Sequence, residues 1–472
     1  MKIQAIIGAA VVASLCCALH AKAPRYVFVF IGDGMSTPQR MVADEFSRES
    51  GRGPLAMNSL PYQSTTRTRA ANALITDSAA AATAIACGEK ANNCSLGVAP
   101  DGTRLESVAE LAHKKGMKVG IMTTVTIVHA TPAGFYAHRK SRGEYYNIAL
   151  DLLDSGFEFF AGGGVYDKYD DAKNPNYRGN VFDLARKAGY SVVTNKADFA
   201  ALRPGCGKAW GVFNKFNLDF AIDRTGRHPS LADMVAKAVE LLDGPQGFFI
   251  MAEGGRLDAA AHGNDPATVV HEAVAMDDAV KVALAFAERH PDETLIVTTG
   301  DHETGGMAMG FAGTGYKFYV GLLAKQKCAT DTFSDMIAER IGSGDSFGFD
   351  DAKRLVTENF GLIFDAAEAD TPEKKLLLLK ESEIGELKKA FKKDVDFVAA
   401  KKAETRAHDV ARRRQFAATA KRLLSNHAGV GWSSGAHTAL PTMTTAQGCG
   451  AENFIGFLEN YDIARKMKAL LK

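Results

Sequence analysis

The segment 26–34 reads YVFVFIGDG and joins a continuous apolar run, Tyr26–Ile31, to the polar turn Gly32-Asp33-Gly34. A run that is apolar at every position, and not only at alternate positions, indicates a strand buried on both faces. Such strands are typical of parallel sheets that helices cover on both sides. The segment therefore favours an α/β protein built on a parallel sheet.

Similar apolar runs recur along the chain and alternate with helical patterns. The runs are Val119–Thr123, Phe157–Phe160, Phe248–Met251 and Leu295–Thr299, and the helical patterns include Leu105–Lys115, Leu231–Leu242 and Val269–Arg289. We expect an α/β fold: a three-layer sandwich with a central, mostly parallel sheet flanked by helices. The charged, helix-forming stretch Thr371–Ser425 predicts a helical insertion, at about residues 311–432, in one domain that spans residues 24–472.

Polar side chains follow four of these predicted strands. Asp33 comes directly after the first, Thr131 follows another by a short loop, and Glu253 and the pair Asp301-His302 follow two more. Binding sites in parallel α/β sheets form at the carboxyl ends of the strands. We therefore expect these side chains to converge at one edge of the sheet.

The stretch Thr76-Asp77-Ser78, followed by four alanines, predicts the start of a helix that Thr76 or Asp77 caps. Ser78 would then lie in the first turn, where unpaired backbone N–H groups and the helix dipole favour an anion. This position suits a serine that becomes an alkoxide and accepts a phosphoryl group. Taken alone, the stretch is more typical of an alanine-rich packing helix with a serine cap.

Asp258 and His262 are spaced i, i+4, so a helix that begins near Asp258 would present both to one cation. Zinc accepts carboxylate and imidazole ligands and can keep one position open for catalysis. Surface helices also carry such pairs by chance. Further candidate ligands would suffice for more than one metal. They are Asp33, Glu253, Asp301, His302 and His437.

Together these motifs make the chain resemble alkaline phosphatases from about Tyr26 to residues 450–452. The matching elements are Ile31-Gly32-Asp33-Gly34-Met35, Thr76-Asp77-Ser78-Ala79-Ala80, His129-Ala130-Thr131-Pro132-Ala133, Glu253-Gly254-Gly255, Asp258 with His262, Thr299-Gly300-Asp301-His302-Glu303-Thr304-Gly305-Gly306 and Gly435-Ala436-His437-Thr438. Their order is that of the family.

The resemblance implies a role for each matching residue. Ser78 would be the nucleophile, Arg142 would bind two phosphate oxygens, and Asp77 would brace Arg142. The implied cofactors are two Zn²⁺ and one Mg²⁺. One zinc would be held by Asp258, His262 and His437, the second by Asp33, Asp301 and His302, and the magnesium by Asp33, Thr131 and Glu253.

The implied activity is hydrolysis of small phosphate monoesters to alcohol and inorganic phosphate through a phosphoserine. Three divalent ions and Arg142 outweigh the four carboxylates and a Ser78 alkoxide, which suits a dianionic monoester better than a monoanionic diester or sulfate ester. The alternative is a phosphodiesterase or sulfatase of the same superfamily. The C/S-x-P-x-R motif of sulfatases is absent around Ser78. A mutase on the same metal scaffold and a non-catalytic binding protein are the other readings.

Two positions depart from the pattern of the family. Ala259 stands where relatives often carry Lys, His or Trp near the phosphate. His129 stands where some relatives have Asp, so its imidazole is expected beside the third metal. His129 leaves open whether that site holds Mg²⁺ or Zn²⁺.

The N-terminus predicts export. Residues 1–23 combine Lys2, the apolar core Ile6–Leu19 and small residues before Pro24, which is typical of a cleaved signal peptide. The expected location is periplasmic or secreted. The formal net charge is +1, so no specific nucleic-acid partner is expected, and no later segment predicts a membrane span. The resemblance also implies a homodimer.

Five cysteines remain after the leader, so at least one stays unpaired within a monomer. Cys87 and Cys94 bracket a short loop and are the expected disulfide in an oxidising compartment. No CxxC spacing predicts a thiolate metal site.

Overall fold

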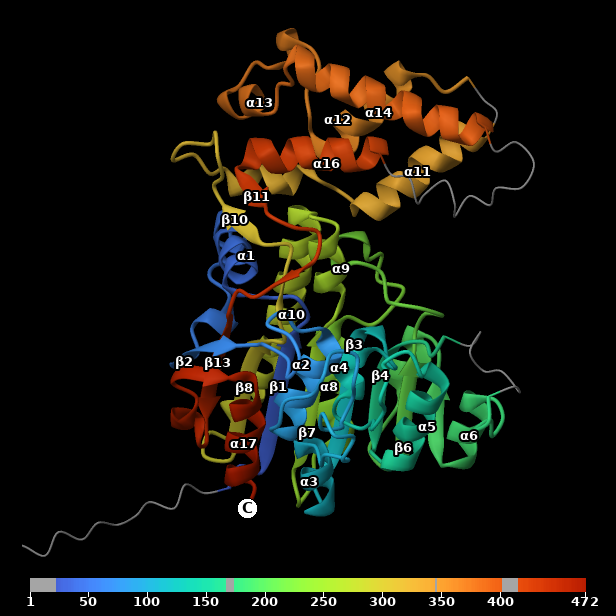
Figure 1. Cartoon of the computed structure of the whole chain (residues 1–472), viewed down its shortest axis with the longest axis vertical. Coiled ribbons are helices and arrows are strands. Elements are labelled where there is room, and N and C mark those ends of the chain that lie inside the picture. The colour runs from blue at the N-terminus through green and yellow to red at the C-terminus, as the bar shows by residue number, and fades with distance from the viewer. Residues whose placement is uncertain (1–22, 167–173, 344–345, 401–414) are drawn as a thin grey trace, which may run out of the picture.

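The computed structural model describes residues 23–166, 174–343, 346–400 and 415–472 (Figure 1). All but the last residue of the predicted signal peptide lies outside these ranges, as do residues 401–414 of the predicted helical insertion. None of the helices in the described ranges has the length and apolar character needed to cross a membrane.

A ten-stranded sheet forms the centre of the fold, in the order β14-β2-β13-β8-β1-β7-β3-β4-β6-β5. Every pair is parallel except those of β13, which runs antiparallel to β8 and β2. The strands are β1 Tyr26–Gly32, β2 Tyr62–Arg67, β3 Lys118–Thr126, β4 Phe159–Gly163, β5 Tyr190–Val193, β6 Lys208–Val212, β7 Phe248–Gly254, β8 Thr294–Gly300, β13 Thr442–Gly448 and β14 Gly456–Glu459. The predicted mostly parallel sheet is confirmed.

Strand β1 is buried at all seven positions because it lies between β7 and β8 and has a helical layer on each face. Tyr26, Phe28 and Phe30 belong to one apolar core, and Val27, Val29 and Ile31 to another. The strand register aligns Gly32 with Gly254 of β7 and Gly300 of β8. The three carboxyl ends therefore meet at one level of the sheet edge.

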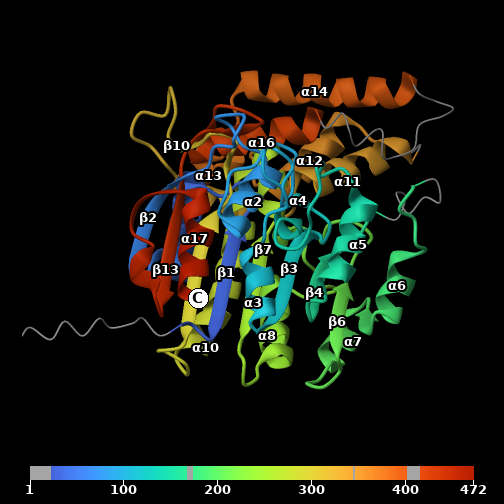
Figure 2. The ribbon, with the colours of Figure 1, turned by 60° about the horizontal axis from the view of Figure 1, so that its bottom comes forward.

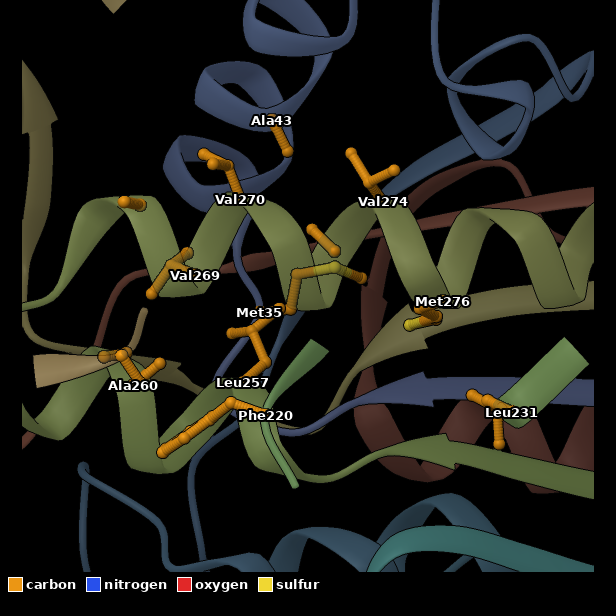
Figure 3. Packing of buried hydrophobic residues seen from close by; sticks show 14 of the residues in the cluster. Met35, Ala43, Phe220, Leu231, Leu257, Ala260, Val269, Val270, Val274 and Met276 are labelled. Carbon is orange, nitrogen blue, oxygen red and sulfur yellow. The ribbon is translucent and has the colours of Figure 1, made fainter. Parts of the chain in front are cut away.

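Helices cover both faces of the sheet, which confirms the three-layer sandwich (Figures 1 and 2). In the first layer, Val270 of α10 lies toward Ala43 of α1, and Val269 toward Ala260 of α9 (Figure 3). This layer contains α1 Thr37–Glu49, α8 Leu231–Leu242, α9 Arg256–His262 and α10 Pro266–Ala287. The other contains α2 Ser78–Cys87, α3 Val108–Lys114, α4 Ala130–Ala133, α5 Tyr145–Ser155, α6 Val181–Lys187 and α17 Asn460–Leu470.

A further group of helices is stacked beyond the carboxyl edge of the sheet (Figure 1). Its interior includes aromatic contacts of Phe333 with Phe360 and of Phe391 with Phe416. The group thus has a packed apolar interior as well as the exposed charged faces that the composition predicted. Its helices are η4 Val320–Lys325, α11 Thr330–Gly342, α12 Phe349–Phe360, α13 Pro372–Leu376, α14 Glu381–Ala400 and α16 Gln415–Ala428.

Two small two-stranded sheets connect this group to the main sheet. One pairs β10, Met307–Met309, with β11, Val430–Trp432. The other pairs β9, Glu303–Thr304, with β12, His437–Thr438. The second pairing brings two distant parts of the sequence to the end of β8.

The expected Cys87–Cys94 disulfide is wrong, because both thiols are free. Cys87 ends α2 and is buried, with its Sγ 3.9 Å from the carbonyl oxygen of Leu105. Cys94 is exposed in the following loop, which turns away so that its N–H can bond the Asp77 carboxylate. The fold of this loop around Asp77 therefore separates the two sulfurs.

Candidate active site

Ser78 is the first residue of α2, as the sequence predicts. Asp77 is the N-cap, and its Oδ1 accepts a hydrogen bond of 3.0 Å from the N–H of Ala80. Ser78 is buried, and its Oγ lies 3.2 Å from Nε2 of His302. The hydroxyl group therefore faces the predicted metal ligands at the N-terminal end of a ten-residue helix.

Arg142 lies beside the start of α2. Its Nη1 donates to Asp77 Oδ2 at 3.1 Å, and its Nη2 lies 3.0 Å from His129 Nε2. Its backbone N–H donates to the carbonyl oxygen of Cys94 at 2.7 Å. Burial opposes the charge on Arg142, but the Asp77 carboxylate outweighs it and raises the pKa of Arg142. Asp77 thus holds both the helix start and the guanidinium, which matches the expected brace.

Buried carboxylates occupy the ends of the central strands. Asp33 follows β1, Asp301 follows β8, and Glu253 lies near the end of β7, all without exposed surface. Asp301 Oδ1 accepts a 3.0 Å bond from the N–H of Gly34. Thr131 Oγ1, in α4, lies 3.3 Å from Asp33 Oδ2 and 3.4 Å from Asp301 Oδ2. The strand-end residues converge at one edge, as expected.

Helix α9 presents Asp258 and His262 on one face. His262 Nε2 lies 3.3 Å from Asp258 Oδ2 and 3.2 Å from Nε2 of His437, which β12 carries. The His437 ring stacks on that of His302, with centroids 3.7 Å apart. His437 Nδ1 lies 2.8 Å from the carbonyl oxygen of Thr76, which fixes the ring against the start of α2.

Three sets of side chains have ligand atoms that lie within 4.8 Å of one another. The first set has the same residues as one expected zinc site. The second contains Asp258 where the resemblance implied Asp301, although His302 Nε2 is also 3.3 Å from Asp301 Oδ2. The third contains His129 in addition to the expected carboxylates. The sets are Asp258, His262 and His437; Asp33, Asp258 and His302; and Asp33, His129 and Glu253.

The charges in this cluster perturb one another strongly. Burial, and then the neighbouring carboxylates, raise the pKa of Asp33 well above its usual value, and burial raises that of Asp301 to about 7. Burial lowers the pKa of His302 to about 4, while a hydrogen bond to Asp258 raises that of His262 to about 9. Buried carboxylates are costly without a compensating cation.

Three buried polar atoms of this cluster have no hydrogen-bond partner in the described part of the chain: Asp33 Oδ1, His129 Nδ1 and Glu253 Oε1. All three belong to the set that includes His129. Buried polar atoms are nearly always paired, so three unpaired atoms on neighbouring side chains indicate a missing partner. Carboxylate and imidazole donors crowded in this way fit divalent cations.

Several supporting residues were not assigned a role from the sequence. Thr304 Oγ1 donates to Asp258 Oδ1 at 2.6 Å, and Thr123 Oγ1 donates to Glu253 Oε2. Glu303 accepts hydrogen bonds from Thr438 Oγ1 and from Gln39 Nε2, and so ties β12 to α1. Thr304 and Glu303 lie within a quoted motif, whereas nothing near Thr123 or Gln39 signals these contacts.

The chain matches known proteins along nearly its whole length. A family model described as alkaline phosphatase matches residues 24–472. Alkaline phosphatase 3 of Bacillus subtilis (strain 168) is 31% identical over 462 residues, which cover 94% of this chain and 88% of that protein.

Solved structures agree with this match. The cold-active alkaline phosphatase of Shewanella sp. has a TM-score of 0.77 and 26% identity, covering 95% of this chain and 100% of that one. The alkaline phosphatase of Thermus thermophilus has a TM-score of 0.74 and 27% identity, covering 94% and 91%.

Proposed function

The chain belongs to the alkaline phosphatase family, and from this premise we propose that it hydrolyses phosphate monoesters through a phosphoserine on Ser78. Enzymes of this family are phosphomonoester hydrolases, and so is this chain. The observation that carries the proposed mechanism is the position of Ser78 Oγ. It lies at a helix start, 3.2 Å from His302, beside a buried cluster of carboxylates.

The proposed cofactors are two Zn²⁺ and one Mg²⁺ in a metal-dependent site. The zinc ions would be held by Asp258, His262 and His437, and by Asp33, Asp301 and His302. The oxygen-rich set of Asp33, Thr131 and Glu253 suits magnesium. When bound, the ions supply Lewis acidity and compensate the negative charge of the carboxylates and of the phosphoryl group.

The residues of the chain provide the nucleophile and orient the ester. The Ser78 hydroxyl loses its proton and its Oγ forms the new bond to phosphorus, while the bond to the alcohol oxygen breaks on the opposite side and that oxygen takes up a proton. Arg142, held by Asp77, donates two hydrogen bonds to phosphoryl oxygens. The positive end of the α2 dipole further stabilises the negative charge. Water then hydrolyses the phosphoserine and restores the Ser78 hydroxyl group.

His129 adds a nitrogen atom to the oxygen ligands of the proposed third metal site. Its Nδ1 lies 3.6 Å from Asp33 Oδ2 and 3.8 Å from Glu253 Oε1. An imidazole nitrogen favours zinc over magnesium, whereas the oxygen ligands favour magnesium. We infer that the two ions compete for this site.

One assay tests the activity against its alternatives within the superfamily. The turnover of an aryl phosphate, its diester and its sulfate should be compared with and without a chelator. We expect the monoester to be preferred and the chelator to abolish its turnover. Preference for the diester or the sulfate would instead identify a phosphodiesterase or a sulfatase.

The remaining expectations are proposals about the whole chain. We propose one catalytic domain, residues 24–472, with an insertion at about 311–432, exported to the periplasm or medium and assembled as a homodimer. The leader-like sequence and the family resemblance support these points. Light scattering after size-exclusion chromatography tests the dimer, and N-terminal sequencing of the exported protein tests the cleavage.

A further inference from the structure

The proposed zinc site of Asp258, His262 and His437 depends on how its two imidazole rings are oriented. His262 Nδ1 lies 2.8 Å from the carbonyl oxygen of Gly435, and His437 Nδ1 lies 2.8 Å from that of Thr76. Because a carbonyl oxygen only accepts hydrogen bonds, both rings carry a proton on Nδ1. The lone pair of each Nε2 can then bind a cation. The carbonyl group of Gly435 therefore fixes the orientation in which His262 can act as a ligand.

The loop of residues 433–436, which joins β11 to β12, carries this carbonyl group. On one side, the N–H of Gly305 donates to a carbonyl oxygen of the loop at 2.9 Å. On the other side the loop faces the end of α9, and in the described part of the chain two hydrogen bonds join them. One is that of His262, and the other, of 2.8 Å, runs from Asn264 Nδ2 to the carbonyl oxygen of Ser434. Of these two, only the hydrogen bond of Asn264 is independent of the ring that the loop orients.

Asn264 ends α9 in a Schellman motif. Its N–H donates to the carbonyl oxygen of Ala261 at 2.9 Å, and the N–H of Asp265 donates to that of Ala260 at 3.0 Å. The backbone of Asn264 is left-handed, with a φ of 49°. Glycine is the usual residue at this position because it has no Cβ, whereas asparagine adopts the conformation at some cost. An asparagine at this position points to a function of its side chain.

The side-chain amide of Asn264 has a defined orientation. Its Nδ2 donates to the carbonyl oxygen of Ser434 and also to that of Ala261, the latter at 3.1 Å. The amide oxygen cannot take the place of Nδ2, because two carbonyl oxygens face it and neither can donate. The amide therefore links the helix that carries two of the proposed zinc ligands to the loop that leads to the third.

We propose that Asn264 is a positioning residue for the zinc ion of Asp258, His262 and His437. By holding the loop against the end of α9, it keeps the carbonyl group of Gly435 within hydrogen-bond distance of His262 Nδ1. Changes to the groups that orient metal ligands typically weaken metal binding by roughly 10–100-fold. This inference rests on the proposed function, because it concerns one of the metal sites proposed there.

Asn264→Gly tests this role, because glycine adopts the left-handed backbone readily and lacks the amide. The metal-free protein is titrated with Zn²⁺ against a chromogenic chelator, and His262→Ala identifies the binding step that belongs to this site. We expect Asn264→Gly to weaken that step by about tenfold and to leave the other steps unchanged. The visible spectrum of Co²⁺ bound at the same site should change, because it reports the arrangement of the ligands. The chelated variant should keep the denaturation midpoint of the wild-type protein.

Asn453→Gly is the matched control. Asn453 Nδ2 also donates to a carbonyl oxygen, that of Gly450, but it lies beyond the end of β13, at the opposite edge of the sheet. This variant should bind Zn²⁺ like the wild-type protein. An equal loss of zinc affinity in both glycine variants would overturn the proposal.

If Asn264→Gly fails to fold, Asn264→Asp decides, because aspartate keeps the shape and tolerates the left-handed backbone but has no N–H to donate. Its added negative charge would by itself favour Zn²⁺, so weaker binding by this variant reports the lost hydrogen bonds. Wild-type zinc affinity of the deciding variant, or an unchanged Co²⁺ spectrum, overturns the proposal. A wild-type protein that binds no Zn²⁺ in the titration would instead contradict the proposed function.

Discussion

At the scale of single residues, His129 decides what the third set of ligands can bind. It is the N-cap of α4, the short helix that carries Thr131, and its ring contacts both this set and Arg142. One imidazole therefore adjoins both the proposed third metal site and the proposed phosphate-binding group. The resemblance predicted that the imidazole lies beside the third set of ligands, whereas nothing in the sequence predicted its contact with Arg142.

His129→Asp should make activity depend less on added magnesium and tolerate more zinc. The substitution removes the nitrogen that zinc favours and adds a carboxylate that can bind the waters of magnesium. The measurement is activity against a magnesium titration at a fixed excess of zinc, for both proteins. Superimposable curves would rule out a role for His129 at the third metal.

At the scale of elements, the carboxyl ends of β1, β7 and β8 set the geometry of the site. The sequence predicted these strands because their apolar runs are continuous, and it predicted the start of α2 because Asp77 can cap it. It did not predict that Asp258 lies near two sets of ligands, or that the Cys94 loop folds around Asp77. Those features depend on contacts between residues far apart in the chain, such as Thr304 with Asp258.

Gly300→Ala should destabilise the end of β8 and the loop that carries Asp33. A Cβ at Gly300 would lie 1.8 Å from the carbonyl oxygen of Met35, so the backbone of one segment must move. We expect a loss of about 2–4 kcal/mol in the free energy of unfolding and weaker metal retention. Denaturant unfolding and metal analysis after dialysis measure both effects.

Gly342→Ala is the control, because a Cβ there meets no atom within 4 Å. This variant should unfold like the wild-type protein. Equal stability of the two alanine variants would contradict the close packing at the end of β8.

At the scale of the whole molecule, we expect the stability of the fold to depend on bound cations, because several carboxylates of the site are buried. In the chelated protein, a positive charge on His262 partly compensates for the buried carboxylates. Its hydrogen bond to Asp258 favours this charge and raises the pKa of His262 to about 9. Because this pKa is raised above the unfolded value, its stabilising effect is complete below pH 6.5 and is lost as the pH rises through 9.

The melting temperature of the chelated protein should therefore fall between pH 6.5 and 9. The metal-loaded protein should be more stable and should not show this fall, because its imidazole ligands are already neutral. Thermal melts across this pH range, with and without chelator, measure the difference. A chelated protein whose stability is constant over this range would contradict the charge balance described for α9.

The central claim is that Ser78 carries the phosphoryl group. The most direct measurement is to quench turnover of an aryl phosphate with acid and to locate the phosphate by peptide mass spectrometry, for the wild-type protein and Ser78→Ala. We expect phosphoserine at Ser78 in the wild-type protein. The variant should lack it and lose at least about 1,000-fold in kcat while keeping its metal content, because only direct attack by water remains. Wild-type turnover by Ser78→Ala, or a phosphate on another residue, would contradict the account.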